Sequence, residues 1–223
     1  RPSQGNAFAA VGLAGAVGVW AGMNEEKIVA TLSSSPSVDV ASRGQPLSFV
    51  IRQTLERAGD LTEATDLLLA PGRLYGGNVI LGDGKAPKAI VIEASANRHA
   101  VFEPEAHSSL VVRTNHFLDP ELALIQNEVL PGPEKAASKA CLTELQALLA
   151  PHEGWIGARE GLAFLRNDYA SSGQGEPSDS AQTLHRVLFY PGKLAMWVAP
   201  DNVRVSHRSH INLDLTLSLL GHR

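Results

Sequence analysis

Residues 77–103 read GNVILGDGKAPKAIVIEASANRHAVFE, in which short apolar runs alternate with turn-forming residues. Val, Ile and Phe favour extended backbone, while Asp83-Gly84 and Ala96-Asn97 supply the residue types that tight hairpin turns require. A fourth apolar run follows shortly after this segment. The pattern predicts consecutive strands at Gly77–Gly82, Ala89–Ala94, His99–Glu103 and Leu110–Thr114.

Two amphipathic helices are predicted before these strands. Apolar residues recur at intervals of three and four residues from Leu47 to Ala58, and Gly59 is a typical residue after a helix end. The same spacing returns in segment 60–70, for which Asp60 or Thr62 is the N-cap. The helices therefore form a consecutive pair.

The N-terminal part of the chain is predicted to add strands. Ile28–Ser33 is a short β-branched run, typical of a strand. Residues 6–23 carry no charge and are about long enough to cross a thin bilayer, but their repeated glycines favour buried strands broken by a tight turn. On the strand interpretation, the core residues are Phe8, Val11, Val17, Val19 and Trp20.

The C-terminal part predicts a helix and a last hairpin. Helical spacing of apolar residues extends over Glu134–Ala150, and Ser171–Ser180 has the polar, Gly/Pro-containing composition of a loop. Thr183–Phe189 and Leu194–Ala199 form a hairpin around Tyr190–Lys193. Hairpin strands separated by blocks of helices indicate the α+β class, with layers built around antiparallel sheets.

Composition excludes several functional classes. The 223 residues are 44% hydrophobic, which is too apolar for a disordered chain, and the net charge of -4 with scattered basic residues offers no surface for nucleic acid. The single cysteine, Cys141, excludes an intrachain disulfide and a cysteine zinc knuckle, and its place in an apolar helical stripe favours a protonated core thiol. The eight histidines lack metal-site spacing, and there is no GxSxG motif. We therefore expect no metal site, no cofactor and no serine triad.

The segment Val111–Phe117, VVRTNHF, is the most informative for chemistry. It places a polar Thr-Asn-His group at the end of an apolar run. The neutral amide of Asn115 can donate a hydrogen bond to a developing oxyanion, which is one interpretation. The alternative is an asparagine that caps the following turn through backbone hydrogen bonds, and the residues alone leave both open.

Several motifs taken together resemble a known family. Gly22–Glu25, Gly77–Asp83, Ile90–Glu93 and Val112–Phe117, in this order around a helix pair, resemble the N-terminal-nucleophile acyltransferases. That family includes isopenicillin N acyltransferase and linear-amide hydrolases, and the resemblance extends from about residue 8 to residue 199. It implies a four-layer αββα sandwich of two antiparallel sheets, with an N-terminal cysteine whose own α-amino group is the base.

The resemblance also implies roles for three residues. Asn115 matches the family's oxyanion-hole asparagine, and the family's second oxyanion donor, a backbone N–H, corresponds to that of Leu32. Arg166 matches a substrate-binding arginine, whose guanidinium can pair with a substrate carboxylate in bidentate fashion. A surface ion pair is the alternative for Arg166, because the local match is short.

No cysteine stands at the start of this chain, and the family's first strands have no counterpart in it. We therefore expect residues 1–223 to be one domain of this fold, incomplete at its N-terminus, with the nucleophile on a second chain or segment produced by autoproteolytic processing. The expected activity is hydrolysis or acyl transfer on a small acyl amide through a cysteine acyl-enzyme. The expected location is cytoplasmic, without nucleic-acid or membrane partners. The alternative is a non-catalytic binding or scaffold protein with the same fold.

Overall fold

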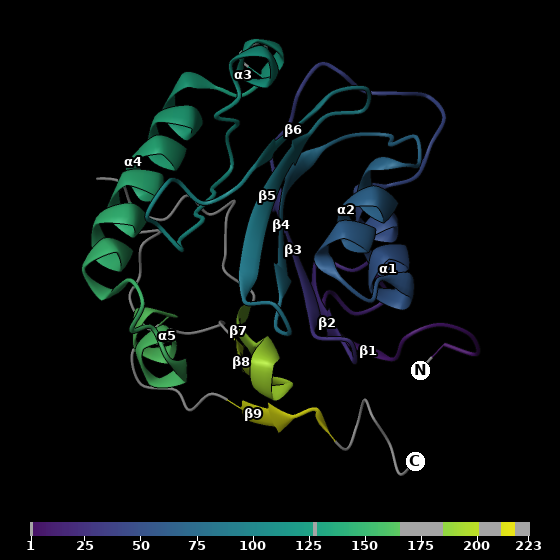
Figure 1. Ribbon diagram of the computed structural model, residues 1–223. Helices are drawn as coiled ribbons and strands as arrows, with labels where there is room; N and C mark the ends of the chain where they lie inside the picture. Colours follow the sequence, from purple (N-terminus) through teal and green to yellow (C-terminus); the bar gives the residue numbers. More distant parts are fainter. Residues whose placement is uncertain (1, 127–128, 166–184, 201–210, 217–223) are drawn as a thin grey trace.

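The computed structural model describes residues 2–126, 129–165, 185–200 and 211–216. In these parts the chain forms layers in the order helices, sheet, sheet, helices (Figure 1). The predicted αββα arrangement is confirmed, and its central feature is a six-stranded antiparallel sheet.

The large sheet consists of strands that pair in chain order, each antiparallel to the next. They are β1 (Phe8–Val11), β2 (Ala21–Asn24), β3 (Ile28–Ser34), β4 (Gly77–Asp83), β5 (Lys88–Ala94) and β6 (His99–Phe102). The strands predicted at 28–33, 77–82, 89–94 and 99–103 are confirmed to within about a residue at most ends. The register pairs Ser33 with Asn78 and Asn78 with Glu93, so these three polar residues share one face of the sheet.

Two helices cover the other face of the large sheet, and both predicted segments are confirmed. They are α1 (Leu47–Arg57) and α2 (Leu61–Leu69), and their apolar sides join the buried residues Ile28, Val79 and Ile92 in one core cluster. Asp60 is the N-cap of α2, because its carboxylate accepts the Glu63 N–H at 2.9 Å.

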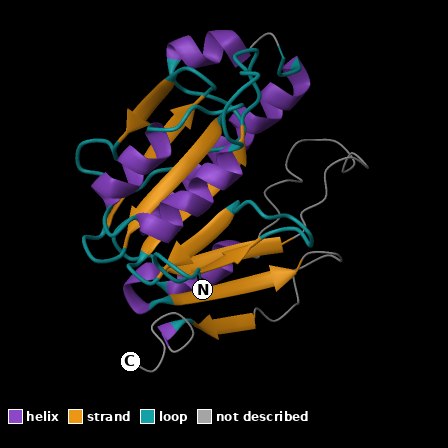
Figure 2. Cartoon of the chain, turned by 90° about the vertical axis from the view of Figure 1, so that its right-hand side faces the viewer, coloured by secondary structure: helices purple, strands orange, loops and turns teal. Residues whose placement is uncertain are grey.

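The second sheet packs on the face of the large sheet that α1 and α2 leave open (Figure 2). Its strands are β7 (His185–Tyr190), β8 (Ala195–Pro200) and β9 (Ile211–Asp214). Val187 and Phe189 of β7 pack toward Met23 of the large sheet, whereas Leu188 contacts the outer helix α5 (Ala158–Leu165). A Cβ at Gly161 of α5 would lie 3.0 Å from Leu188, so a glycine permits this close approach.

The remaining helices lie on the same side as the second sheet. They are α3 (Pro120–Gln126), α4 (Gly132–Leu149) and the short 3-10 helices η1 (Ala150–His152) and η3 (Pro191–Lys193). The helix predicted at 134–150 and the hairpin around 190–193 are confirmed where the structure describes them. Nothing in the sequence analysis predicted α3, α5 or β9. None of the helices in the described segments combines the length and apolar character needed to cross a membrane.

Two expectations were wrong. Leu110–Thr114 is not a strand: these residues belong to the loop between β6 and α3, whose backbone is held by side chains rather than by a neighbouring strand. Val17 and Trp20 are 58% and 49% exposed rather than core, because the connection between β1 and β2 leaves the sheet. From that connection only Val19 enters the core, where its N–H donates to the Ser48 carbonyl at 2.9 Å.

Candidate active site

Asn115 lies in the long loop between β6 and α3, at the end of β3. Its side-chain Nδ2 donates to the Ser34 carbonyl at 2.9 Å, and the residue is exposed. An amide nitrogen carries two hydrogens. Within the described segments, the second hydrogen of Asn115 has no acceptor, so this donor is open to a ligand.

The backbone of Asn115 is fixed although its side chain is exposed. Its N–H donates to Ser138 Oγ at 2.9 Å, and its carbonyl accepts from Gln126 Nε2 at 3.4 Å. The carbonyls of the two flanking residues, Thr114 and His116, both accept from Asn78 Nδ2 at 2.9 Å. The amide is therefore presented from a rigid segment, which is what electrostatic stabilisation of a transition state requires.

His116 is part of a buried hydroxyl cluster beneath Asn115. Its Nδ1 lies 2.8 Å from Ser138 Oγ and 3.1 Å from Thr114 Oγ1, and all three residues are buried. Burial lowers the pKa of the imidazole, and the nearby Lys139, Lys135 and Arg113 charges lower it further. Ser138 Oγ donates its hydrogen to Thr114 Oγ1 at 3.0 Å, so a neutral ring that carries its proton on Nδ1 fits this cluster as a donor to Ser138 Oγ.

This lowered pKa predicts a loss of stability on mild acidification. In the unfolded chain His116 binds a proton below pH about 6.5, whereas in the folded chain it does so only at a lower pH. The contribution of this ring to the free energy of unfolding is therefore complete above pH about 6.5 and declines below it. The slope is at most about 1.4 kcal/mol per pH unit for one proton. We expect the free energy of unfolding, measured in urea, to differ less between pH 7.5 and pH 5.5 in His116→Asn than in the wild type.

The matched control for this pH experiment is His99→Asn, at an exposed position on β6. It should keep the wild-type pH dependence. An unchanged pH dependence in His116→Asn would contradict the assignment of acid sensitivity to this ring.

An ion pair anchors the two ends of the Asn115 segment. Arg113 Nε donates to Glu93 Oε1 at 2.7 Å, and the Glu93 carboxylate also accepts the N–H groups of Leu118 and Asp119 at 2.9–3.0 Å. Glu93 is fully buried, and the Arg113 guanidinium lies 4.5 Å from the centre of the Phe102 ring. The carboxylate on β5 therefore holds both ends of the loop segment.

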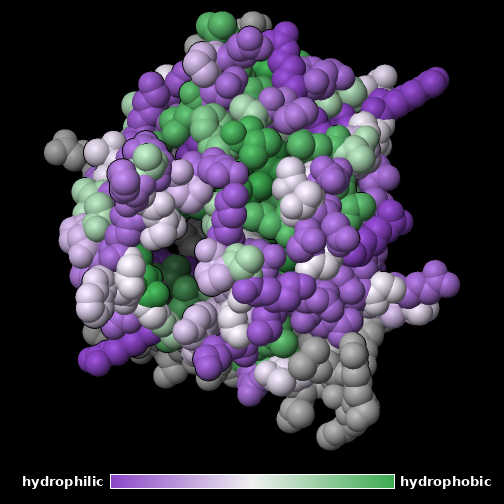
Figure 3. Space-filling view, in the orientation of Figure 1, coloured by the Kyte–Doolittle hydropathy of each residue, from purple (hydrophilic) through white to green (hydrophobic). Residues whose placement is uncertain are grey.

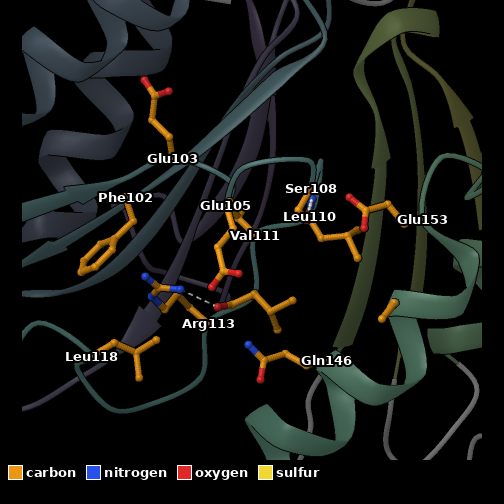
Figure 4. A pocket seen from close by; sticks show the side chains of 12 residues that line it. Phe102, Glu103, Glu105, Ser108, Leu110, Val111, Arg113, Leu118, Gln146 and Glu153 are labelled. Carbon is orange, nitrogen blue, oxygen red and sulfur yellow. Dashed lines mark hydrogen bonds between the residues drawn. The ribbon is translucent and has the colours of Figure 1, made fainter.

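A cavity of about 390 Å³ lies beside this segment. Arg113 and Leu118 line it on one side, and Gln146 of α4 lines another (Figure 4). The molecular surface is hollowed on this side, between α4 and the large sheet (Figure 3). The cavity borders Arg113 and Leu118, at the two ends of the segment that carries Asn115, but does not include Asn115 itself.

The other two site residues predicted from the sequence are Leu32 and Arg166. The Leu32 N–H on β3 donates at 2.8 Å to the carbonyl of Trp20, the residue before β2, so in this structure it already has an acceptor. Leu32 lies two residues from Ser34, the residue that Asn115 contacts, and its oxyanion role stays a prediction. Arg166 lies outside the described residues. In the described parts of the chain, no cluster of His, Cys, Asp or Glu could hold a metal ion.

Cys141 is half-buried on α4. Burial raises the pKa of its thiol, and the nearby Glu144 raises it further. A protonated thiol is a weak nucleophile, so the environment of Cys141 opposes a nucleophilic role. The raised pKa agrees with the protonated thiol expected from the sequence. The side chain of Cys141 is less buried than its place in an apolar helical stripe predicts.

Comparison with known proteins identifies the family. The model of the acyl-coenzyme A:6-aminopenicillanic acid acyl-transferase family matches residues 2–204. The chain belongs to this family. A search of curated protein sequences finds no significant match.

Solved structures show the same fold as this family member. Two variants of conjugated bile acid hydrolase from Clostridium perfringens align with TM-scores of 0.56 and 0.57 at 12% and 14% identity, covering 95% and 89% of this chain and 77% and 73% of theirs. Penicillin V acylase from Agrobacterium tumefaciens gives 0.51 at 16% identity, covering 92% of this chain and 74% of that one. The likeness confirms the predicted N-terminal-nucleophile hydrolase fold, and family membership supports amide hydrolase or acyltransferase activity.

Sequence reasoning missed the residues that hold Asn115. Asn78 and Glu93 are polar residues inside apolar strand runs, on the face opposite α1 and α2. A buried polar side chain in such a run needs a partner, and this signal was available. Ser138 and Gln126 carried no comparable signal, because polar residues are common on helices.

Proposed function

We propose that this chain forms part of an amide C–N hydrolase or acyltransferase that acts through a cysteine acyl-enzyme. Family membership and the fold support the reaction class. The observation that carries the proposal is Asn115. Its exposed amide has one N–H without an acceptor among the described residues, and it stands on a segment whose backbone is fixed by buried side chains.

In the proposed reaction, a cysteine thiolate attacks the carbonyl carbon of an acyl amide and forms a C–S bond. Negative charge develops on the carbonyl oxygen, and the Asn115 Nδ2–H donates to it. The tetrahedral adduct collapses, the C–N bond breaks, and the leaving amine takes the proton that the base removed from the thiol. Water or a second amine then attacks the thioester and releases the acyl group.

The nucleophile is proposed to be an N-terminal cysteine on a segment or chain outside this sequence, since Cys141 is unsuited to the role. The cysteine's own α-amine, with an ordinary pKa near 8, is the base. Leu32 N–H is the proposed second oxyanion donor, which requires the Trp20 carbonyl to release it. Arg166 is the proposed partner of a substrate carboxylate.

The test uses the protein isolated in its native form, incubated with a series of N-acyl p-nitroanilides. We expect release of p-nitroaniline and, after acid quenching, intact-mass detection of a polypeptide that begins with cysteine and carries the added acyl group. Iodoacetamide should block both signals. A lone species of this chain that releases no p-nitroaniline and accepts no acyl group would instead support a binding or scaffold protein.

A further inference from the structure

Asn78 is a buried asparagine on the central strand β4, and its side chain reaches the Asn115 segment. It is 1% exposed, and its Nδ2 donates to the carbonyls of Thr114 and His116 at 2.9 Å each. Both hydrogens of one amide group are therefore used on the two residues that flank Asn115. This contact fixes the orientation of the peptides on either side of the proposed oxyanion donor.

The side-chain oxygen of Asn78, its hydrogen-bond acceptor, differs from the nitrogen. Its Oδ1 is buried, and within the described segments it has no hydrogen-bond partner. A buried unpaired oxygen costs about 1–3 kcal/mol, so this position is unfavourable for stability alone. In the part of the chain that the structure describes, the side-chain hydrogen bonds of Asn78 are those of its donor group, and both are directed at the Asn115 segment.

We infer that Asn78 is a positioning residue for Asn115, holding its peptide so that the amide stays aimed at the reacting carbonyl. This inference rests on the proposed function. Ser138 acts from the opposite side, since its hydroxyl accepts the Asn115 N–H from α4. The sheet and the helix thus fix one three-residue segment between them.

The chain offers a matched control in Asn24 on β2. Asn24 is also fully buried, and its Nδ2 also donates to two backbone carbonyls, those of Leu55 and Ala58, at 3.0 and 2.8 Å. These carbonyls belong to the end of α1, on the other face of the sheet from Asn115. The two asparagines therefore share their burial and the use of their donor groups but differ in the segment that they hold. They differ also at the acceptor, because Asn24 Oδ1 accepts the Ile28 N–H at 2.9 Å.

The experiment compares Asn78→Leu with Asn24→Leu, each a side chain of similar size without a donor. Both variants should shift the urea midpoint downward. Only Asn78→Leu should speed amide exchange at Asn115 and Phe117 by about tenfold or more. In the assembled enzyme with an N-acyl p-nitroanilide, Asn78→Leu should lower kcat by about 10²-fold with KM changed less than about threefold, whereas Asn24→Leu should leave kcat within about threefold.

Several outcomes decide the inference separately from the proposed function. Equal losses of kcat in the two leucine variants, or unchanged exchange at Asn115 and Phe117 in Asn78→Leu, would overturn it. If Asn78→Leu does not fold, Asn78→Ser takes its place, because a hydroxyl has one hydrogen and cannot donate to both carbonyls. Faster exchange at Asn115 and a lower kcat are expected, and wild-type values would contradict the inference. If the wild-type enzyme turns over no amide, the proposed function fails, while the exchange comparison still tests whether Asn78 holds the segment.

Discussion

Replacing Asn115 by alanine should lower turnover of an amide substrate by about 10²–10³-fold, which corresponds to about 3–4 kcal/mol of lost transition-state stabilisation. The amide group is the donor proposed for the oxyanion, whereas its one hydrogen bond within the described residues is to the Ser34 carbonyl. Because the residue is exposed, stability should fall by no more than about 1.5 kcal/mol. The measurements are kcat and KM on an N-acyl p-nitroanilide and urea unfolding of the same preparations.

Asn6→Ala is the control for this variant. Asn6 is also an asparagine outside the buried core whose Nδ2 donates to one backbone carbonyl, that of Ala58, at 2.8 Å. It should lose a similar amount of stability and keep wild-type kcat. Near-wild-type activity in Asn115→Ala, or an equal loss of activity in Asn6→Ala, would remove Asn115 from the oxyanion site.

Most of the fold could be predicted because its elements are regular. The segment 77–103 alternates apolar runs with hairpin turns, and segments 47–58 and 60–70 have helical periodicity with suitable ends. The wrong strand at 110–114 has a specific cause. An apolar run bounded by polar residues is typical of a strand. Here side chains hold the run in place of a partner strand: Asn78 donates to the Thr114 carbonyl, and Glu93 accepts from the Arg113 side chain.

The site could be predicted only in part, because its parts are far apart in sequence. The Thr-Asn-His group singled out Asn115, and β3 brings Ser34 to it across 81 positions. The residues that hold Asn115 come from a strand and two helices, at positions 78, 126 and 138. Which polar residues meet depends on sheet register and helix placement, and local patterns do not specify either.

The second large effect is expected at Glu93, the buried carboxylate that anchors the loop. Glu93→Gln should lower the free energy of unfolding by about 3–5 kcal/mol, since it leaves the Arg113 guanidinium buried without its counter-ion. The new amide NH2 would also face backbone N–H donors of Leu118 and Asp119. Urea unfolding of the variant and the wild type measures this difference.

The two partners of the ion pair should not be equivalent. Arg113→Met leaves Glu93 with the N–H groups of Leu118 and Asp119, so we expect a smaller loss of about 1–3 kcal/mol.

Glu103→Gln is the exposed control for Glu93→Gln. Glu103 pairs with Lys88 at 2.9 Å, and the two side chains are 65% and 49% exposed. Loss of this ion pair should lower the free energy of unfolding by less than about 1 kcal/mol. Equal costs for Glu93→Gln and Glu103→Gln would show that burial adds nothing to this pair. A larger cost for Arg113→Met than for Glu93→Gln would show that the guanidinium, rather than the carboxylate, holds the loop.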